Sequence, residues 1–350
     1  MSRSRSYAAL CLFLFGAVVL TACGSKASTT ADAATSEQTS TPVTDVPRRV
    51  PPGTSLRVGD QLDALKLVLG TAGQDKAFSY DVKYASFVGG PPMLQAFKAG
   101  AIDIGTVADT PLIFAQAAHQ DVVAVAAWAP QHGSLELIAT PGSHISSWKD
   151  LKGKKLAYQQ GTVLEAVALQ GLQHAGLTLH DVKSVNIPVT QISAALQSGS
   201  VDAAILVPPL DTAYLASHPD AKIVDRPEDI TDRVSFIIAS KKALDNPAKV
   251  AAIRDYVQRL VRSHKWIAAH PQEWVQTFYV GQYHLPAAQG LAQLQRIGPT
   301  SFLPLPGDLV APQQALADLY VDAGDIPKKL DVSSEFDGRL NAAVREAQAG

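Results

Sequence analysis

Short apolar runs alternate with amphipathic stretches along the chain from residue 53 onwards. The apolar runs predict strands at Leu56–Gly59, Val82–Phe87, Ile102–Val107 and Val122–Trp128, and the stretches between them predict helices at Leu62–Leu69, Pro92–Lys98 and Pro111–Ala118. Strands that alternate with helices are typical of an α/β fold with a largely parallel sheet. We therefore expect this class of fold for the folded body.

An internal repeat suggests two similar lobes. The pattern of residues 95–104 (QAFKAGAIDI) recurs at residues 194–203 (AALQSGSVDA), and each copy reads as a helix end, a glycine stop and a strand. A proline-bearing loop follows each copy, at Asp109-Thr110-Pro111 and at Pro208-Pro209-Leu210. Because loops that leave strand carboxyl ends carry ligands in such sheets, two lobes facing one cleft are expected. Chance similarity between common helix–turn–strand units is the alternative.

The lobe boundaries follow from two extended apolar segments, Leu135–Thr140 and Ser235–Ser240, each of which could cross between lobes. Lobe 1 is then predicted at residues 53–139 plus 238–350, and lobe 2 at 140–237. Each lobe is expected to hold a mixed, mostly parallel sheet flanked by helices. A long helix is predicted at Pro247–Ala268, and the aromatic residues Trp266 and Trp274 are interpreted as core.

The N-terminus reads as a secretory signal, predicted over residues 1–22. Arg3 and Arg5 precede an apolar run from Tyr7 to Leu20, which is shorter than a comfortable membrane span. The residues Leu20-Thr21-Ala22-Cys23 resemble the bacterial lipobox, which implies lipidation of Cys23 and a place on the extracytoplasmic face of a membrane. An uncleaved anchor helix with an incidental Cys23 is the alternative.

Composition and charge argue against several classes of function. Residues 23–52, after the signal, are rich in Ser, Thr, Ala and Pro, as in a flexible tether. With Arg3 and Arg5 removed, 28 basic and 32 acidic groups leave a net charge of −4, which gives no case for nucleic-acid binding. Cys11 and Cys23 are the only cysteines, so we expect no disulfide or thiolate chemistry in the body. The nine histidines form no close pair, and neither a metal site nor a cofactor is expected.

Several segments carry a specific resemblance. They are residues 87–96 (FVGGPPMLQA), 98–105 (KAGAIDIG), 108–117 (ADTPLIFAQA), 150–157 (DLKGKKLA), 160–162 (QGT), 175–177 (AGL) and 319–329 (LYVDAGDIPKK). In order and spacing they resemble the periplasmic binding proteins for aliphatic sulfonates, taurine and nitrate that feed ABC importers. The resemblance implies a two-lobed clamp of the type II periplasmic-binding-protein fold with two hinge crossovers. It also implies a monomer that takes up a small ligand and docks on an ABC permease and its ATPase.

The candidate site follows from loops that could present backbone amides to an anion. Gly89 and Gly90 permit close approach of the main chain, while Thr162 and Thr110 stand at predicted helix starts. The expected ligand-binding residues are Gln61, Gly89, Gly90, Pro91, Asp109, Thr110, Gln160, Gly161, Thr162 and Pro208. An equally open alternative is that the glycines and threonines only form turns and caps.

Five acidic residues and one tryptophan have further expected roles. Asp103 and Asp202, at the start of both repeated strands, are expected to be structural. Asp60 and Asp109 together would favour a ligand with an ammonium group, although Asp60 or Asp63 capping the first helix is slightly favoured. Trp128 is expected to pack in the core.

Two other classes of function stay open. A desulfinase and thiamine-pyrimidine synthases share the architecture, but they depend on thiols that this body lacks, so only an enzyme without a thiol would fit. A receptor that presents its ligand state to a sensor protein is the other alternative. Our expectation is a binding protein that is not an enzyme.

Overall fold

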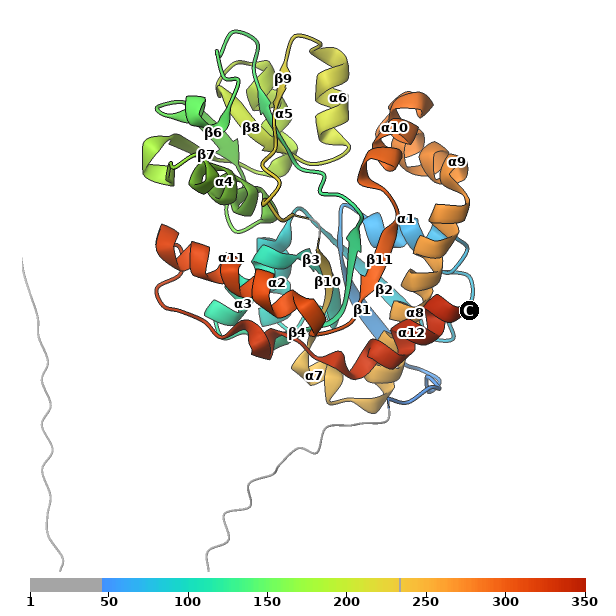
Figure 1. Ribbon diagram of the computed structural model, residues 1–350. Helices are drawn as coiled ribbons and strands as arrows, with labels where there is room; N and C mark the ends of the chain where they lie inside the picture. Colours follow the sequence, from blue (N-terminus) through green and yellow to red (C-terminus); the bar gives the residue numbers. More distant parts are fainter. Residues whose placement is uncertain (1–45, 233) are drawn as a thin grey trace, which may run out of the picture. The chain divides into compact units, whose positions relative to one another are not determined.

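The computed structural model describes residues 46–232 and 234–350 (Figure 1). The predicted signal, Cys23 and most of the predicted tether lie outside these residues. Among the helices described, none combines the length and apolar character that crossing a bilayer requires.

The first sheet has six strands in the order β11-β4-β10-β3-β1-β2. The pairings β1–β2 and β1–β3 are parallel, whereas β10 is antiparallel to both β3 and β4, and β11 is antiparallel to β4. Four strands therefore run in one direction, and only β10 and β11 are reversed. The strands are β1 (Ser55–Gln61), β2 (Asp81–Phe87), β3 (Ile104–Ala108), β4 (Val122–Pro130), β10 (Ser235–Ser240) and β11 (Thr300–Leu303).

The second sheet has five strands in the order β7-β6-β8-β5-β9. Parallel pairings join β6 to β7 and to β8, and β5 runs antiparallel between β8 and β9. The strands are β5 (Glu136–Ala139), β6 (Lys155–Tyr158), β7 (Lys183–Asn186), β8 (Ala203–Leu206) and β9 (Lys222–Val224). The predicted pair of mixed sheets, each with most strands in one direction, is confirmed.

Helices follow most of the strands, as the alternating pattern predicts (Figure 1). In the first half of the chain they are α1 (Ala64–Thr71), α2 (Gly90–Lys98), α3 (Asp109–Ala117), α4 (Val163–His174), α5 (Val189–Gln197) and α6 (Leu210–Ser217). After β10 come α7 (Lys241–Leu244), α8 (Pro247–Ala269), α9 (Pro271–Trp274), the π-helix η3 (Val275–Gln282), α10 (Ala287–Ile297), α11 (Val310–Ala323) and α12 (Asn341–Ala349). Short 3-10 helices are η1 (Trp148–Leu151), η2 (Leu179–Asp181), η4 (Gly307–Leu309), η5 (Val332–Glu335) and η6 (Gly338–Leu340).

The chain crosses between the sheets at residues 131–135 and again between β9 and β10. Strand β5 lies entirely in the second sheet and β10 entirely in the first, so the expected boundaries after residues 139 and 237 were misplaced by a few residues. Both strands are apolar because they are buried within a sheet. An apolar, extended segment of this kind looks the same in the sequence whether it crosses between lobes or lies within one sheet. The two crossings are tied together, since the Asp232 carboxylate accepts the Ser134 and Leu135 amides at 3.0 and 2.8 Å.

The internal repeat is a structural one. Gly100 and Gly199 have φ of +64° and +67°, the left-handed conformation expected where each helix stops. Asp103 accepts the amide of Arg57 in β1 at 2.8 Å, and Asp202 accepts the amide of Lys155 in β6 at 2.7 Å. The structural role expected for both aspartates is confirmed, because each carboxylate accepts a backbone amide from the neighbouring parallel strand.

A further core cluster joins both halves to the C-terminal region. Helix α11 contributes Leu316 and Tyr320, which pack with Ile113 of α3 and with Ala166 and Leu169 of α4. Since α3 follows a strand of the first sheet and α4 a strand of the second, α11 holds the two sheets together on one side. The sequence pattern placed α11 in the first lobe without this bridging role.

Candidate functional site

One cavity, called the main cavity below, lies where the two sheets meet. It has a volume of about 700 Å³. Ala108 and Pro130 reach it from the carboxyl ends of β3 and β4, Val207 and Pro208 from the carboxyl end of β8, and Val163 from the start of α4. Residues of both crossings complete this face, so the cavity occupies the predicted cleft between two post-strand loops.

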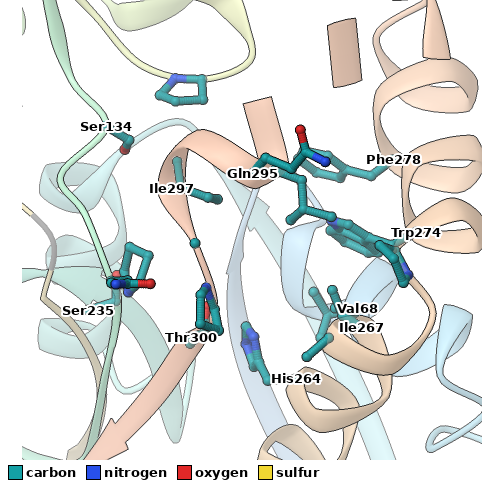
Figure 2. A pocket seen from close by; sticks show the side chains of 18 of the residues that line it. Val68, Ser134, Ser235, His264, Ile267, Trp274, Phe278, Gln295, Ile297 and Thr300 are labelled. Carbon is teal, nitrogen blue, oxygen red and sulfur yellow. The ribbon is translucent and has the colours of Figure 1, made fainter. Parts of the chain in front are cut away.

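One end of the cavity is polar. Ser134 lies in the first crossing, Ser235 begins β10, and Thr300 begins β11 (Figure 2). Within the described residues, the hydroxyls of Ser134 and Ser235 make no hydrogen bond to the protein. These hydroxyls can therefore donate to a ligand oxygen without breaking an internal bond.

The other end of the cavity is apolar. Figure 2 shows Val68, Ile267, Trp274 and Phe278 on the far side of the segment 297–300 from Ser134 and Ser235. These side chains come from α1, α8, α9 and η3, and Leu291 and Leu294 of α10 complete the wall. Trp274 is thus a cavity wall as well as a core residue, which corrects its interpretation as core alone.

His264 lines the apolar end between Trp128 and Phe302. Its ring centroid lies 6.0 Å from that of Trp128 and 5.6 Å from that of Phe302. Burial lowers the pKa of His264 to about 4, so the ring is neutral at pH 7. Trp128 packs in the core as expected, and it reaches the cavity only through this histidine.

A pair of matching Asp-Thr turns follows the repeated strands. In α3, Asp109 Oδ1 accepts the Thr110 amide at 2.6 Å and the Thr110 hydroxyl at 3.1 Å. In α6, Asp211 Oδ1 accepts the Thr212 amide and hydroxyl at the same 2.6 and 3.1 Å. The repeat seen in the sequence therefore includes these two Asp-Thr pairs, which lie 102 positions apart. The sequence comparison did not align them, because it matched the proline-bearing loops instead.

The two aspartates differ in their charge partners. Asp211 bonds Arg296 of α10, whereas burial raises the pKa of Asp109 to about 7. Asp109 lines a second cavity of about 570 Å³. The Gln313 amide there donates to the Asp109 carbonyl at 3.2 Å and to Glu335 Oε2 at 2.8 Å. Burial also raises the pKa of Glu335 to about 8, so the Gln313 amide joins two residues, Asp109 and Glu335, whose carboxyl groups ionise only near neutral pH.

The glycine loop before α2 packs against the protein itself. A Cβ on Gly90 would lie 2.3 Å from Pro111 Cγ, and one on Gly89, whose φ is +86°, would lie 3.0 Å from Gln159 Nε2. Pro91 Cγ lies 3.3 Å from the position of a Cβ on Gly161. These glycines permit close packing of α2 against α3 and against the β6–α4 loop, which is the purely structural alternative left open by the sequence.

The start of α4 carries its own carboxylate. Thr162 caps the helix by accepting the Leu164 amide at 3.2 Å, as expected. The Gly161 amide, however, donates to Glu165 Oε2 at 2.8 Å. Glu165 is fully buried, and burial raises its pKa to about 7. An internal carboxyl group therefore takes the amide that was predicted to meet an anionic ligand.

Tyr320 of α11 joins the two loops on the same side. Its hydroxyl lies 3.2 Å from Thr110 Oγ1 and 3.5 Å from the Thr162 carbonyl oxygen. Gln160 is held in a similar way, donating to Asp325 Oδ1 at 3.2 Å. The segment around Tyr320 formed part of the sequence resemblance, but a buried tyrosine gave no sign of this bridging role.

Asp60 and Gln61, at the end of β1, make hydrogen bonds within the protein. Asp60 accepts the amides of Leu65 and Lys66 at 2.8 and 2.9 Å, so it caps the first turn of α1, the alternative that the sequence favoured. Gln61 donates its side-chain amide to the Thr106 carbonyl at 2.8 Å. Neither residue lines the main cavity.

Of the ten predicted ligand-binding residues, Pro208 alone lines the main cavity. Asp109 lines the second cavity. Two neighbours of predicted residues line the main cavity: Ala108, next to Asp109, and Val163, next to Thr162. The remaining residues line neither cavity and lie at the end of β1, in the first turns of α2 and α3 or in the loops that precede α2 and α4: Gln61, Gly89, Gly90, Pro91, Thr110, Gln160, Gly161 and Thr162. The sequence pointed to the edges of the sheets that the main cavity adjoins, and it gave no sign of the wall that α8, α9 and α10 supply.

Comparison with known proteins shows a family match, similar sequences and similar structures. The model of the family described as "NMT1/THI5 like" matches residues 81–274. A relative from Escherichia coli (strain K12), named putative aliphatic sulfonates-binding protein, is 29% identical over 79% of this chain and 87% of its own length.

Two solved structures share the fold. The alkanesulfonate-binding protein SsuA from Xanthomonas axonopodis pv. citri, bound to MOPS, is 25% identical and superposes with a TM-score of 0.73, covering 82% of this chain and 99% of that one. The desulfurization enzyme DSZB is 13% identical, with a TM-score of 0.58 over 83% of this chain and 99% of that one, and this likeness concerns the fold alone.

Proposed function

This chain belongs to the NMT1/THI5-like family, and we propose that it is an extracytoplasmic solute-binding protein that captures a small organic sulfonate or a related zwitterion such as taurine. The ligand enters the cavity between the two sheets. The loaded protein then docks on an ABC permease, whose ATPase drives uptake. Lipidation of Cys23 keeps the protein at the membrane surface.

One observation carries the proposal. The cavity of about 700 Å³ opens where the carboxyl ends of β3, β4 and β8 meet, and it is lined by both crossings between the sheets. Ligands bind in this position in open α/β folds. The relative named for aliphatic sulfonates covers most of the chain, which supports a sulfonate as the ligand class.

The chemistry of the site favours binding over catalysis. Charged groups near the crossings are paired within the protein, since Arg226 bonds Asp232 at 2.9 Å and Arg296 bonds Asp211 at 2.8 Å. At the polar end, the hydroxyls of Ser134 and Ser235 are donors that make no hydrogen bond to the described residues. Neutral donors of this kind can hold a sulfonate group without a cation.

The test is binding of a ligand panel to the full chain, followed by analysis of the recovered ligand. Taurine, alkanesulfonates, nitrate, carboxylates and small amines are compared in thermal denaturation. A ligand at a hundred times its Kd adds about 2.7 kcal/mol to the free energy of unfolding. We expect a sulfonate to stabilise the protein and to be recovered unchanged; a chemically altered ligand would favour an enzyme on this fold instead.

A further inference from the structure

Two adjoining cavities, called the distal cavities below, lie at the end of the first sheet opposite the main cavity. Asp103 directly precedes β3, Val122 begins β4, and the reversed strand β10 ends at Ser240, so these three residues meet at one end of the sheet. They line a cavity of about 870 Å³, and a cavity of about 460 Å³ shares part of its lining. The main cavity lies at the carboxyl ends of β3 and β4, which are the other ends of the same strands.

Exposed lysines gather around the distal cavities. Lys241 pairs with Asp121, with 3.8 Å between Nζ and Oδ1. The other four form no ion pair with any described residue. Together the five exposed lysines that line the distal cavities make up the basic face: Lys98, Lys241, Lys242, Lys328 and Lys329.

The acidic groups of the distal cavities do not cancel this charge. Asp103 pairs with both Arg57 and Lys249, each at 2.6 Å, so this carboxylate is outnumbered by its own partners. Burial raises the pKa of Glu335 to about 8, so it carries little charge at pH 7. The remaining acidic lining residues are Asp121, Asp245 and Asp331. The distal cavities are therefore positively charged, although the whole chain has a net charge of −2.

The described chain begins beside this end of the sheet. Val46 and Val50 pack against the core cluster that includes Leu244 of α7 and Val250 of α8. Figure 1 shows the start of the described residues, in blue, next to these two helices. A flexible chain over residues 24–45, the tether predicted from the sequence, spans about 25 Å on average. A lipid on Cys23 would therefore keep this end of the sheet close to the membrane surface.

We propose that the basic face docks on anionic phospholipid headgroups of the membrane that holds the lipid anchor, with the lipid phosphates bound at the distal cavities. This inference rests on the lipid anchor of the proposed function and adds a second membrane contact to it. Because the main cavity lies at the opposite end of the same strands, the docked protein presents that cavity away from the membrane and can capture its ligand there.

Docking of this kind is weak and reversible. Each basic residue near an anionic leaflet strengthens binding about fivefold, so the four unpaired lysines give a Kd on the order of 1 mM. A short flexible tether supplies an effective concentration that is also in the millimolar range. The anchored protein is therefore docked about half of the time, and it leaves the surface readily to meet the permease.

The first test measures, by mass spectrometry, how fast each lysine of the lipidated full chain is acetylated on vesicles. Phosphatidylcholine vesicles are compared with vesicles of phosphatidylcholine and phosphatidylglycerol in equal amounts. At about 0.01 M salt the anionic vesicles should slow acetylation of Lys98, Lys242, Lys328 and Lys329 about twofold. The effect should vanish at about 1 M salt, where the Debye length is about 3 Å. Internal controls from the second lobe, which should not change, are Lys149, Lys183 and Lys222.

Each other outcome contradicts a separate part of the argument. Equal acetylation on the two kinds of vesicle overturns membrane docking by the basic face and leaves the anchor and the proposed function standing. Failure to attach to either kind of vesicle overturns the lipid anchor, whereas sulfonate binding is measured separately. Equal slowing by soluble glycerol phosphate would assign the distal cavities to a free phosphate compound instead of a membrane.

The second test reverses the charge of the basic face and keeps Lys98 as the reporter. The triple variant Lys242→Glu, Lys328→Glu and Lys329→Glu should abolish the slowing of Lys98 acetylation on anionic vesicles. The matched control makes the same change of charge in the second lobe, and it should keep the slowing: Lys149→Glu, Lys183→Glu and Lys222→Glu. All six lysines are exposed and form no ion pair with a described residue, so both variants should fold. The same loss in both variants would show a nonspecific effect of net charge and overturn the basic face.

Discussion

Arg296 and Asp211 form an ion pair between α10 and α6, with 2.8 Å between Nη2 and Oδ2. Arg296 also pairs with Glu136 of β5. The arginine lies in the C-terminal region beside the first sheet, and both carboxylates belong to the second sheet and its helix. Together with Tyr320 on the other side, this pair connects the two halves around the cavity, and it defines the first of five predictions.

Arg296→Met is expected to lower the free energy of unfolding by about 1–3 kcal/mol, less than for a fully buried pair because the arginine is partly exposed. The cause is Asp211, whose side chain is 2% exposed and would lose its cation. Adding Asp211→Asn should recover part of the loss, as measured by urea denaturation. Arg48→Met is the control, since the Arg48–Glu346 pair is 75% and 38% exposed and should cost less than about 0.5 kcal/mol. Equal losses in the two arginine variants would contradict this view.

Tyr320→Phe is expected to cost about 1 kcal/mol, because it removes the hydroxyl between Thr110 and Thr162. Tyr214→Phe is the matched control: among the described residues, the buried Tyr214 hydroxyl has no hydrogen-bond partner. Its removal should be neutral or stabilising. Urea midpoints of the two variants should therefore differ, and a Tyr320→Phe variant as stable as Tyr214→Phe would remove the bridging role of α11.

Stability should fall as the pH rises from about 5 to about 8. Burial raises the pKa of Glu335 to about 8, above its ordinary value near 4.5. In this window the folded protein keeps a proton that the unfolded chain has released, so ionisation disfavours the folded state. Stability is thus fully present below the unfolded pKa and is lost as the pH passes through the folded one.

Glu335→Gln should flatten this decline and make the variant relatively more stable at pH 8, while its amide oxygen can still accept from Gln313. Free energies of unfolding at pH 5, 6.5 and 8 measure the slope. In the Glu335→Gln variant, part of the decline of stability with pH should remain, because burial raises the pKa of the nearby Asp109 to about 7. Asp150→Asn is the control: the pKa of this exposed group is lowered to about 2 by bonds from Ser146 and Ser147, so the slope between pH 5 and 8 should not change.

Gly90→Ala should destabilise the protein by about 1–3 kcal/mol, because its Cβ would overlap Pro111 and push α2 away from α3. Gly70→Ala, inside α1, is the opposite case. Its nearest neighbour would be Asp75 Oδ2 at 3.6 Å, and it should gain about 0.5–1 kcal/mol from helix propensity. Thermal denaturation of both variants measures the difference, and a stable Gly90→Ala protein would show that α2 and α3 can separate freely.

Cys23→Ser should move the protein from the membrane fraction to the soluble extracytoplasmic fraction. The reason is loss of the thiol that a lipid would modify, since the lipid chains supply the membrane affinity. Fractionation and immunoblotting measure the distribution. Cys11→Ser, inside the predicted signal, is the matched control and should leave the protein on the membrane; retention of Cys23→Ser as well would contradict the lipid anchor.

Local patterns determined the strands, the helices that follow them and the structural roles of Asp60, Asp103 and Asp202. The reason is that burial alternation, helix stops and caps depend on neighbours in the chain. Lobe boundaries were less certain, because β5 and β10 look alike as apolar segments whether they cross between sheets or lie within one.

The walls of the cavity were decided by tertiary structure alone. Trp274 and Phe278 read as ordinary core residues, and their contact with the cleft arises only when α8, α9 and α10 fold back beside the crossings. In the same way, no local signal reveals that Tyr320 bridges Thr110 and Thr162. Sequence therefore determined the fold, and long-range packing determined which side chains line the cavity, because those contacts join residues more than a hundred positions apart.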